Sequence, residues 1–119
     1  LIHLAAAGVT NNSSNFYDNF QFNVIKSSQL IDSAIKAGCT SFIVAGSCFE
    51  YGLTGNTVQF LDVNDRLMPV GCHATSKAVF FLNLKYKYEL APLNFSYLRL
   101  FQVYGQNEYR RLGALRHFS

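Results

Sequence analysis

The chain has 119 residues, of which 50% are hydrophobic and 14% charged, and its formal net charge is +3. This length allows one small domain, and the composition favours a buried α/β core over a disordered segment. The positive charges form no long run, which argues against nucleic acid as a partner. The basic residues that cluster near the carboxyl end are expected on a solvated helix face: Arg110, Arg111, Arg116 and His117.

No apolar run reaches the roughly 18 residues that a membrane-spanning helix needs. No signal peptide is visible either, so we expect a cytoplasmic protein with no membrane partner. The three cysteines, Cys39, Cys48 and Cys72, match no zinc-binding spacing. They are therefore expected to be reduced thiols, and no metal site is predicted.

The first half of the chain predicts a strand, a loop and a helix. Residues 1–6 form an apolar run that is typical of a buried parallel strand. Residues 8–15 are rich in Gly, Thr, Asn and Ser and predict a loop. Apolar residues then recur at helical spacing, with Asn15 suited to the N-cap and Gly38 to the position that follows a helix.

The second half predicts two further strands around another helix. The expected elements are, in chain order, a strand at 41–45 closed by Gly46, a loop at 47–70, a helix at 73–90, a strand at 95–101, a turn at Gly105 and a short helix near Tyr109. Alternation of strands and helices predicts a parallel sheet in a doubly wound α/β fold. Ligands of such sheets bind beyond the carboxyl ends of the strands, which places residues 5–8, 47–52 and 101–105 around one crevice.

Ser47, His73 and Lys77 are the side chains at that crevice most suited to chemistry. His73 and Lys77 are four residues apart and share one helix face. A lysine there could contact a cofactor ribose, and the hydroxyl of Ser47 could hold a substrate oxygen. By itself, however, a His-x-x-x-Lys pattern is more typical of an ordinary surface pair at the start of a helix.

Five segments give this pattern a context. They are Leu1-Ile2-His3-Leu4-Ala5-Ala6; Asn23-Val24 with Leu30-Ile31-Asp32-Ser33-Ala34; Ala45-Gly46-Ser47-Cys48-Phe49-Glu50-Tyr51-Gly52; Pro69-Val70-Gly71-Cys72-His73-Ala74-Thr75-Ser76-Lys77-Ala78; and Leu98-Arg99-Leu100-Phe101-Gln102-Val103-Tyr104-Gly105. In this order the chain resembles the extended short-chain dehydrogenase/reductase family of NAD-dependent sugar-nucleotide epimerases and dehydratases. The matching motifs are "VIHLAA", "NV-x-G-T-x-x-LL-x-A-A", "SS-x-x-x-YG", "P-x-x-x-Y-x-x-S-K-A" and "LR-x-FNVYGP". They span nearly the whole chain.

The resemblance implies a Rossmann-like fold, a nucleotide-sugar substrate and NAD as the cofactor, with NADP left open. It implies catalytic positions for Ser47, His73, Lys77 and Asn23, the last within a distorted helix. The cofactor would contact Ala5, Ala6, Lys77, Phe101 and Val103. The substrate would contact Ser47, Cys48 and Gln102, and a full-length form could be a homodimer.

His73 departs from the resemblance because the family has tyrosine there as its acid/base. Imidazole has an ordinary pKa near 6.5, and its nitrogens reach less far from the backbone than a tyrosine hydroxyl does. Three interpretations follow: an impaired or inactive homologue, a changed acid/base, and a sequencing or gene-fragment artefact. A non-catalytic dinucleotide- or nucleotide-sugar-binding module is the alternative function.

Cys48 and Phe49 are a second departure, since the family's dehydratases carry an Asp-Glu pair there. Glu50 comes one position late and, on a strand end, is expected to face the other way. The chemistry implied is therefore that of an epimerase or a reductase. Cys48 has no base beside it in the sequence, so it is not expected to act as a nucleophile.

The resemblance also predicts how much of a domain the chain supplies. A glycine-rich turn for the pyrophosphate would precede Leu1, and a substrate domain would follow Ser119. We therefore expect residues 1–119 to be the central part of an NAD(P)-binding Rossmann-like domain. The chain alone would then lack the first βαβ units and the carboxy-terminal substrate domain, and would be inactive.

Overall fold

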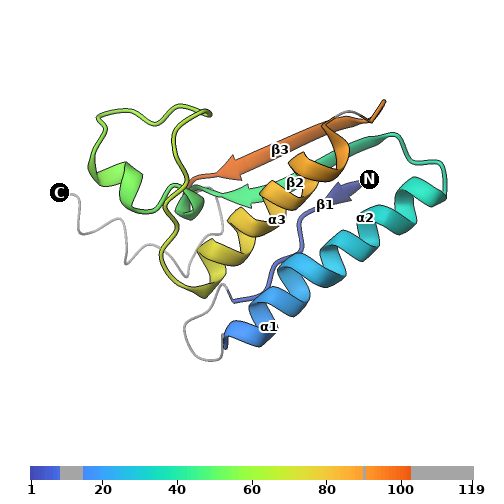
Figure 1. The fold of residues 1–119 in the computed structure, drawn as a ribbon, viewed down its shortest axis with the longest axis horizontal. Helices are drawn as coiled ribbons and strands as arrows, with labels where there is room; N and C mark the ends of the chain where they lie inside the picture. Colours follow the sequence, from blue (N-terminus) through green and yellow to red (C-terminus); the bar gives the residue numbers. More distant parts are fainter. Residues whose placement is uncertain (9–14, 90, 103–119) are drawn as a thin grey trace, which may run out of the picture.

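The computed structural model of the chain describes residues 1–8, 15–89 and 91–102. They form one parallel three-stranded sheet in the order β1 (Ile2–His3), β2 (Ser41–Ser47) and β3 (Asn94–Leu100) (Figure 1). In register, Ile2 lies opposite Ile43 and Ser47 lies opposite Leu100. The predicted α/β class and parallel sheet are confirmed.

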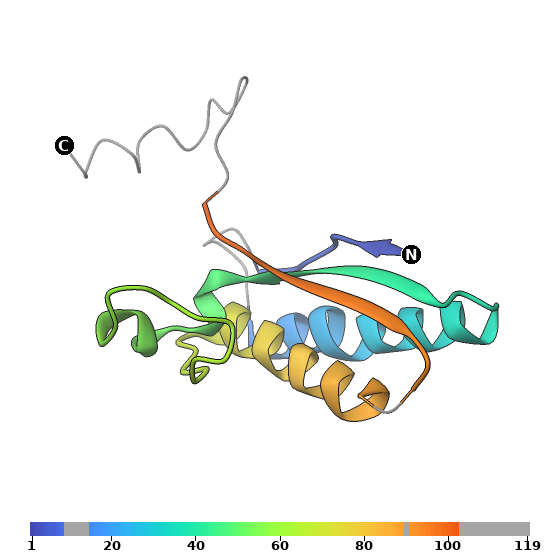
Figure 2. The ribbon, with the colours of Figure 1, turned by 90° about the horizontal axis from the view of Figure 1, so that it is seen from above.

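The helices lie together on one face of this sheet (Figure 2). A continuous helical stretch contains α1 (Phe16–Phe20), the π-helical turn η1 (Gln21–Lys26) and α2 (Ser27–Lys36). The second long helix is α3 (Cys72–Tyr88). Within the described residues, no helix covers the opposite face of the sheet, where Ile43, Leu98 and Leu100 are 40–46% exposed. These residues therefore supply one helical layer of the two that a doubly wound sheet carries.

The predicted ends of the first helix are confirmed. The side chain of Asn15 accepts a hydrogen bond from the backbone N–H of Asp18 at 2.7 Å. Gly38 has φ +88°, and its N–H donates to the carbonyl of Ile35 while that of Cys39 donates to Ala34. This is the Schellman arrangement, which needs a residue that tolerates the left-handed region.

The core lies between the helices and the sheet. Its buried side chains come from η1, α2, β2 and α3: Val24, Ile31, Phe42, Val44, Phe80 and Leu84. Phe16 begins the predicted run of apolar residues at helical spacing but is 53% exposed, because it lies in the first turn of α1, where it stacks on Phe20. No described helix is both long and apolar enough to cross a membrane.

Two predicted segments differ from the structure. The first strand ends at His3 rather than residue 6, because the backbone of Ala7 bonds to the side chain of Asn23 and not to β2. The predicted loop at 47–70 contains two 3₁₀ turns, η2 (Cys48–Glu50) and η3 (Leu53–Asn56). The expected turn at Gly105 and helix near Tyr109 fall outside the described residues.

Candidate functional site

Ser47 lies at the carboxyl end of β2 and begins the turn η2. Its hydroxyl accepts a bond from Phe49 N at 3.3 Å, and its own N–H donates to Glu50 Oε1 at 2.8 Å. The two bonds form a capping box, which satisfies backbone donors that a short helix leaves without partners. The strand end and the turn thus fix the backbone of Ser47 at the edge where parallel-sheet proteins bind ligands.

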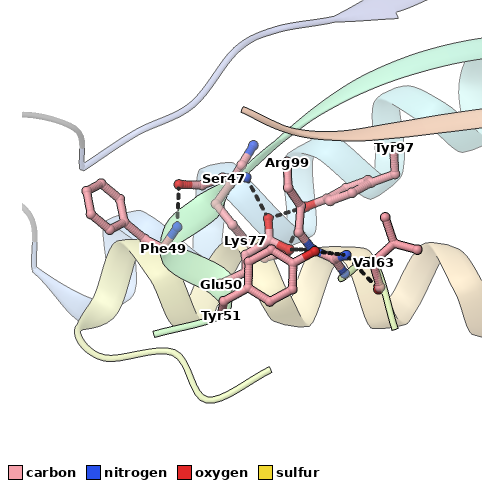
Figure 3. Close-up of polar contacts among 8 residues, drawn as sticks. All are labelled: Ser47, Phe49, Glu50, Tyr51, Val63, Lys77, Tyr97 and Arg99. Atoms are coloured by element: carbon pink, nitrogen blue, oxygen red, sulfur yellow. Dashed lines mark hydrogen bonds and ion pairs between the residues drawn. The ribbon is translucent and has the colours of Figure 1, made fainter. Parts of the chain in front are cut away.

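Lys77 lies one turn into α3 and is only 3% exposed. Its side chain extends from the helix toward the end of β2 (Figure 3). Burial lowers the pKa of Lys77, while the negative charge of Glu50 opposes that change. Among the described residues its ammonium donates no hydrogen bond, so the N–H groups at the end of this mostly buried side chain are available for a ligand.

His73 lies in the first turn of α3 and contacts the chain beyond β1. Its Nδ1 is 2.9 Å from the carbonyl oxygen of Ala7. A carbonyl only accepts, so Nδ1 carries the proton of this bond. Nε2 is then the ring atom with a free lone pair in the neutral form.

Asn23 ties the same segment to the helices. Its Oδ1 accepts from Ala7 N at 2.7 Å, and its Nδ2 donates to Ala7 O at 3.0 Å and to Ser76 Oγ at 2.9 Å. The helix distortion that the resemblance implies is present, because Asn23 lies inside the π-helical turn η1. A π-helical turn redirects side chains and is frequent at functional sites.

One cavity of about 270 Å³ lies beside the exit of β1. Its lining includes Ala5, Ala6 and Asn23, together with Lys26 at the end of η1. Ser47, His73 and Lys77 do not line it. The structure therefore divides the predicted residues between this cavity and the ends of β2 and α3.

The other predicted contacts lie at or beyond strand ends. Phe101 and Gln102 follow β3 and are exposed, while Val103 is outside the described residues. Cys48 is half-buried in η2, and burial raises the pKa of its thiol, which disfavours the nucleophilic thiolate.

A buried charged network beneath Ser47 was not predicted from the sequence. Glu50 was expected to face away by strand alternation, but residues 48–50 form a 3₁₀ turn and its carboxylate lies fully buried under β2. There Arg99 Nε donates to Oε2 and the Tyr97 hydroxyl to Oε1, each at 2.9 Å. The only sequence signal was a lone acidic residue next to the strand end and an arginine within β3.

His3 of β1 is buried and has a partner in α2. Its Nε2 lies 2.9 Å from Ser27 Oγ, and its ring packs edge-on against Phe80. Burial lowers the pKa of His3, and the positive charge of Lys77 lowers it further. The ring is consequently neutral near pH 7.

Comparisons with known proteins support the fold and show the family. The sequence model of the NAD dependent epimerase/dehydratase family matches residues 1–118. A solved UDP-N-acetylglucosamine 4-epimerase from Methanobrevibacter ruminantium M1, in complex with UDP-N-acetylmuramic acid, is 28% identical with a TM-score of 0.76. The similarity covers 87% of this chain and 33% of that enzyme.

The enzyme WbmG of Bordetella bronchiseptica, solved with NAD and UDP, shares the fold with a TM-score of 0.72 at 21% identity. That similarity covers 87% of this chain and 31% of WbmG. The chain thus spans about a third of the length of these two enzymes. No curated protein matches its sequence significantly.

Proposed function

The chain belongs to the NAD-dependent epimerase/dehydratase family, and on that premise we propose that it carries the Ser47–His73–Lys77 site of a sugar-nucleotide epimerase or reductase. The observation that carries the proposal is the mostly buried side chain of Lys77, which extends toward the carboxyl edge of the sheet. Burial reduces the hydration of this ammonium, so it is suited to a ligand that brings hydrogen-bond acceptors.

NAD fits these residues because its ribose hydroxyls are acceptors of the kind that Lys77 lacks among its described neighbours. The methyl side chains of Ala5 and Ala6 leave room for a cofactor to approach the backbone after β1. Phe101 and Val103 are proposed to border the nicotinamide, which would accept the hydride. NADP is the alternative cofactor.

A nucleotide sugar is the proposed substrate. The complex of the 28% identical epimerase with UDP-N-acetylmuramic acid supports this class. Ser47 would orient the reacting sugar oxygen, with Cys48 and Gln102 contacting the substrate nearby. Since Cys48 and Phe49 cannot perform the work of an Asp-Glu pair, we propose epimerase or reductase chemistry rather than dehydration.

His73 would be the proton-transfer group, acting through Nε2 as a neutral base. Its bond to Ala7 O holds the ring near the exit of β1, and imidazole reaches less far than a tyrosine hydroxyl. Displacement of a reacting group on the ångström scale costs about 100-fold in rate. We therefore propose that the site turns over slowly.

The test is His73→Tyr in the protein expressed from its complete open reading frame. We expect turnover of a UDP-sugar with NAD to rise by about 100-fold, because the hydroxyl would reach the substrate oxygen. The reverse exchange on the exposed face of the same helix, Tyr86→His, is the control and should leave turnover unchanged.

Equal turnover of the parent protein and His73→Tyr would show that position 73 does not transfer the proton. Binding of NAD and UDP-sugar without turnover in either protein would favour the alternative, a non-catalytic dinucleotide- or nucleotide-sugar-binding module. Absence of binding of NAD, NADP and UDP-sugar alike would contradict both functions.

A further inference from the structure

We propose that Glu50 is a positioning residue of this site: its carboxylate, held by Arg99, fixes Ser47 and the backbone of Lys77 relative to each other and faces the Lys77 ammonium with a negative charge. The inference rests on the proposed function of Ser47 and Lys77. The geometry that supports it is that of the buried hydrogen-bond network of Glu50, Arg99 and Tyr97.

The carboxylate of Glu50 connects three elements (Figure 3). Oε1 accepts from Ser47 N of β2 at 2.8 Å and from the Tyr97 hydroxyl of β3 at 2.9 Å. The same hydroxyl is 3.1 Å from the carbonyl oxygen of Lys77 in α3, so its single proton faces both acceptors. Burial, followed by the charge of Glu50, raises the pKa of Tyr97, which keeps this proton in place.

Arg99 holds the carboxylate from its other side. Its Nε donates to Glu50 Oε2 at 2.9 Å, and the two side chains are only 10% and 0% exposed. The guanidinium lies 4.3 Å from the ring centroid of Phe81 and 5.0 Å from that of Tyr51. Aromatic faces stabilise a guanidinium, so Glu50 meets a cation whose position is fixed.

Gly46 shows how closely the network packs under the strand. A Cβ at this position would lie 2.2 Å from Tyr97 Cε1 and 2.7 Å from Glu50 Oε1. The "SS" motif of the family has serine here, which this arrangement could not hold without a shift. The glycine therefore makes room for Tyr97 and Glu50 directly beside Ser47.

Glu50 also acts on Lys77 through its negative charge. Lys77 interacts through its charge with His3 of β1 and Glu50 of η2. The Tyr97 hydroxyl of β3 donates toward the Lys77 carbonyl oxygen, Arg99 of β3 pairs with Glu50, and His73 precedes Lys77 by one turn of α3. Glu50 is the acidic side chain of this group. Its negative charge favours the protonated form of Lys77 against the effect of burial.

Glu50→Gln tests the proposal because it removes the charge and keeps the shape. Protein from the complete open reading frame would carry lysine labelled with ¹³C at Cε, with the Lys77 signal assigned by its loss in Lys77→Met. Without the carboxylate we expect Lys77 to titrate at lower pH. NAD binding that depends on the ammonium should be lost as the pH is raised. We expect this loss at a lower pH in Glu50→Gln than in the parent protein.

Tyr97→Phe is the second variant, because it keeps the charge and the packing of the ring but removes the hydroxyl that links Glu50 to Lys77. We expect kcat to fall with little change in KM, and the alkaline limit of NAD binding to stay where it is in the parent. Asp32→Asn breaks an ion pair away from the site and is the matched control, which should leave both readouts unchanged.

The outcomes separate the two proposals. An unshifted Lys77 titration in folded Glu50→Gln, or an unchanged kcat in Tyr97→Phe, would overturn the role of Glu50. If Glu50→Gln shifts the Lys77 titration but the parent protein binds no NAD, the proposed function is overturned. The charge coupling between Glu50 and Lys77 then still holds. If Glu50→Gln does not fold, Tyr97→Phe decides the positioning role by its kcat.

Discussion

Two ion pairs of this chain lie in contrasting surroundings. Glu50 and Arg99 meet under the carboxyl ends of β2 and β3, with side chains 0% and 10% exposed. Asp32 and Lys87 meet across the surfaces of α2 and α3, at 2.8 Å, with side chains 38% and 34% exposed. The chemistry of the two pairs is alike, and their burial differs.

The difference shows what each pair can do. An exposed pair is screened by water and contributes little, although the Tyr88 hydroxyl also donates to Asp32. A buried pair needs further hydrogen bonds to its charged groups, and Glu50 accepts on both oxygens: Oε1 from Ser47 N and the Tyr97 hydroxyl, and Oε2 from Arg99 Nε. Burial therefore makes the Glu50 pair specific in geometry and places it where it can act on Lys77.

The largest expected effect is that of Glu50→Ala, which leaves the guanidinium of Arg99 buried without its carboxylate. Breaking one side of a buried pair costs about 3–5 kcal/mol. The free energy of unfolding, measured by urea denaturation, should fall by that amount. A loss below about 1 kcal/mol, the range of exposed pairs, would mean that burial does not distinguish the two.

A smaller effect is expected from His3, which is buried, as Glu50 is. Its pKa is lowered in the folded state, so below pH 6.5 the unfolded chain takes up a proton that the folded chain does not. Stability should therefore fall as the pH drops below 6.5, by about 1.4 kcal/mol for each unit of pKa difference. Urea denaturation of the parent and of His3→Gln at pH 8 and pH 5 measures this effect. The free energy of unfolding should fall less between these pH values in the variant than in the parent.

The smallest effect is expected from Asp32→Asn, at about 0.2–1 kcal/mol. Bonds from Lys87 and Tyr88 lower the pKa of Asp32, so its contribution is present above pH 3.8 and disappears as the pH falls through the lowered value. Added salt should reduce the difference between parent and variant, measured by denaturation at neutral pH. A salt-independent loss as large as that of Glu50→Ala would contradict the assignment of this pair to the exposed class.

The sequence by itself determined the local elements and the family. Helix ends at Asn15 and Gly38 and the parallel strands followed from capping chemistry and apolar runs, because these patterns depend on neighbours in the chain. The motifs around Ser47 and Lys77 placed both residues next to the carboxyl edge of the sheet, because each motif spans the end of a strand or the start of a helix.

Only the tertiary structure decided how the site is supported. Glu50 and Arg99 are 49 residues apart, and nothing local shows that they meet. The 3₁₀ turn after Ser47 rotates Glu50 inward, where strand alternation predicted the opposite. Hydrogen bonds between distant segments likewise end β1 at His3 and hold His73 at Ala7. Such contacts depend on which elements pack together, and the sequence pattern of each element does not contain that information.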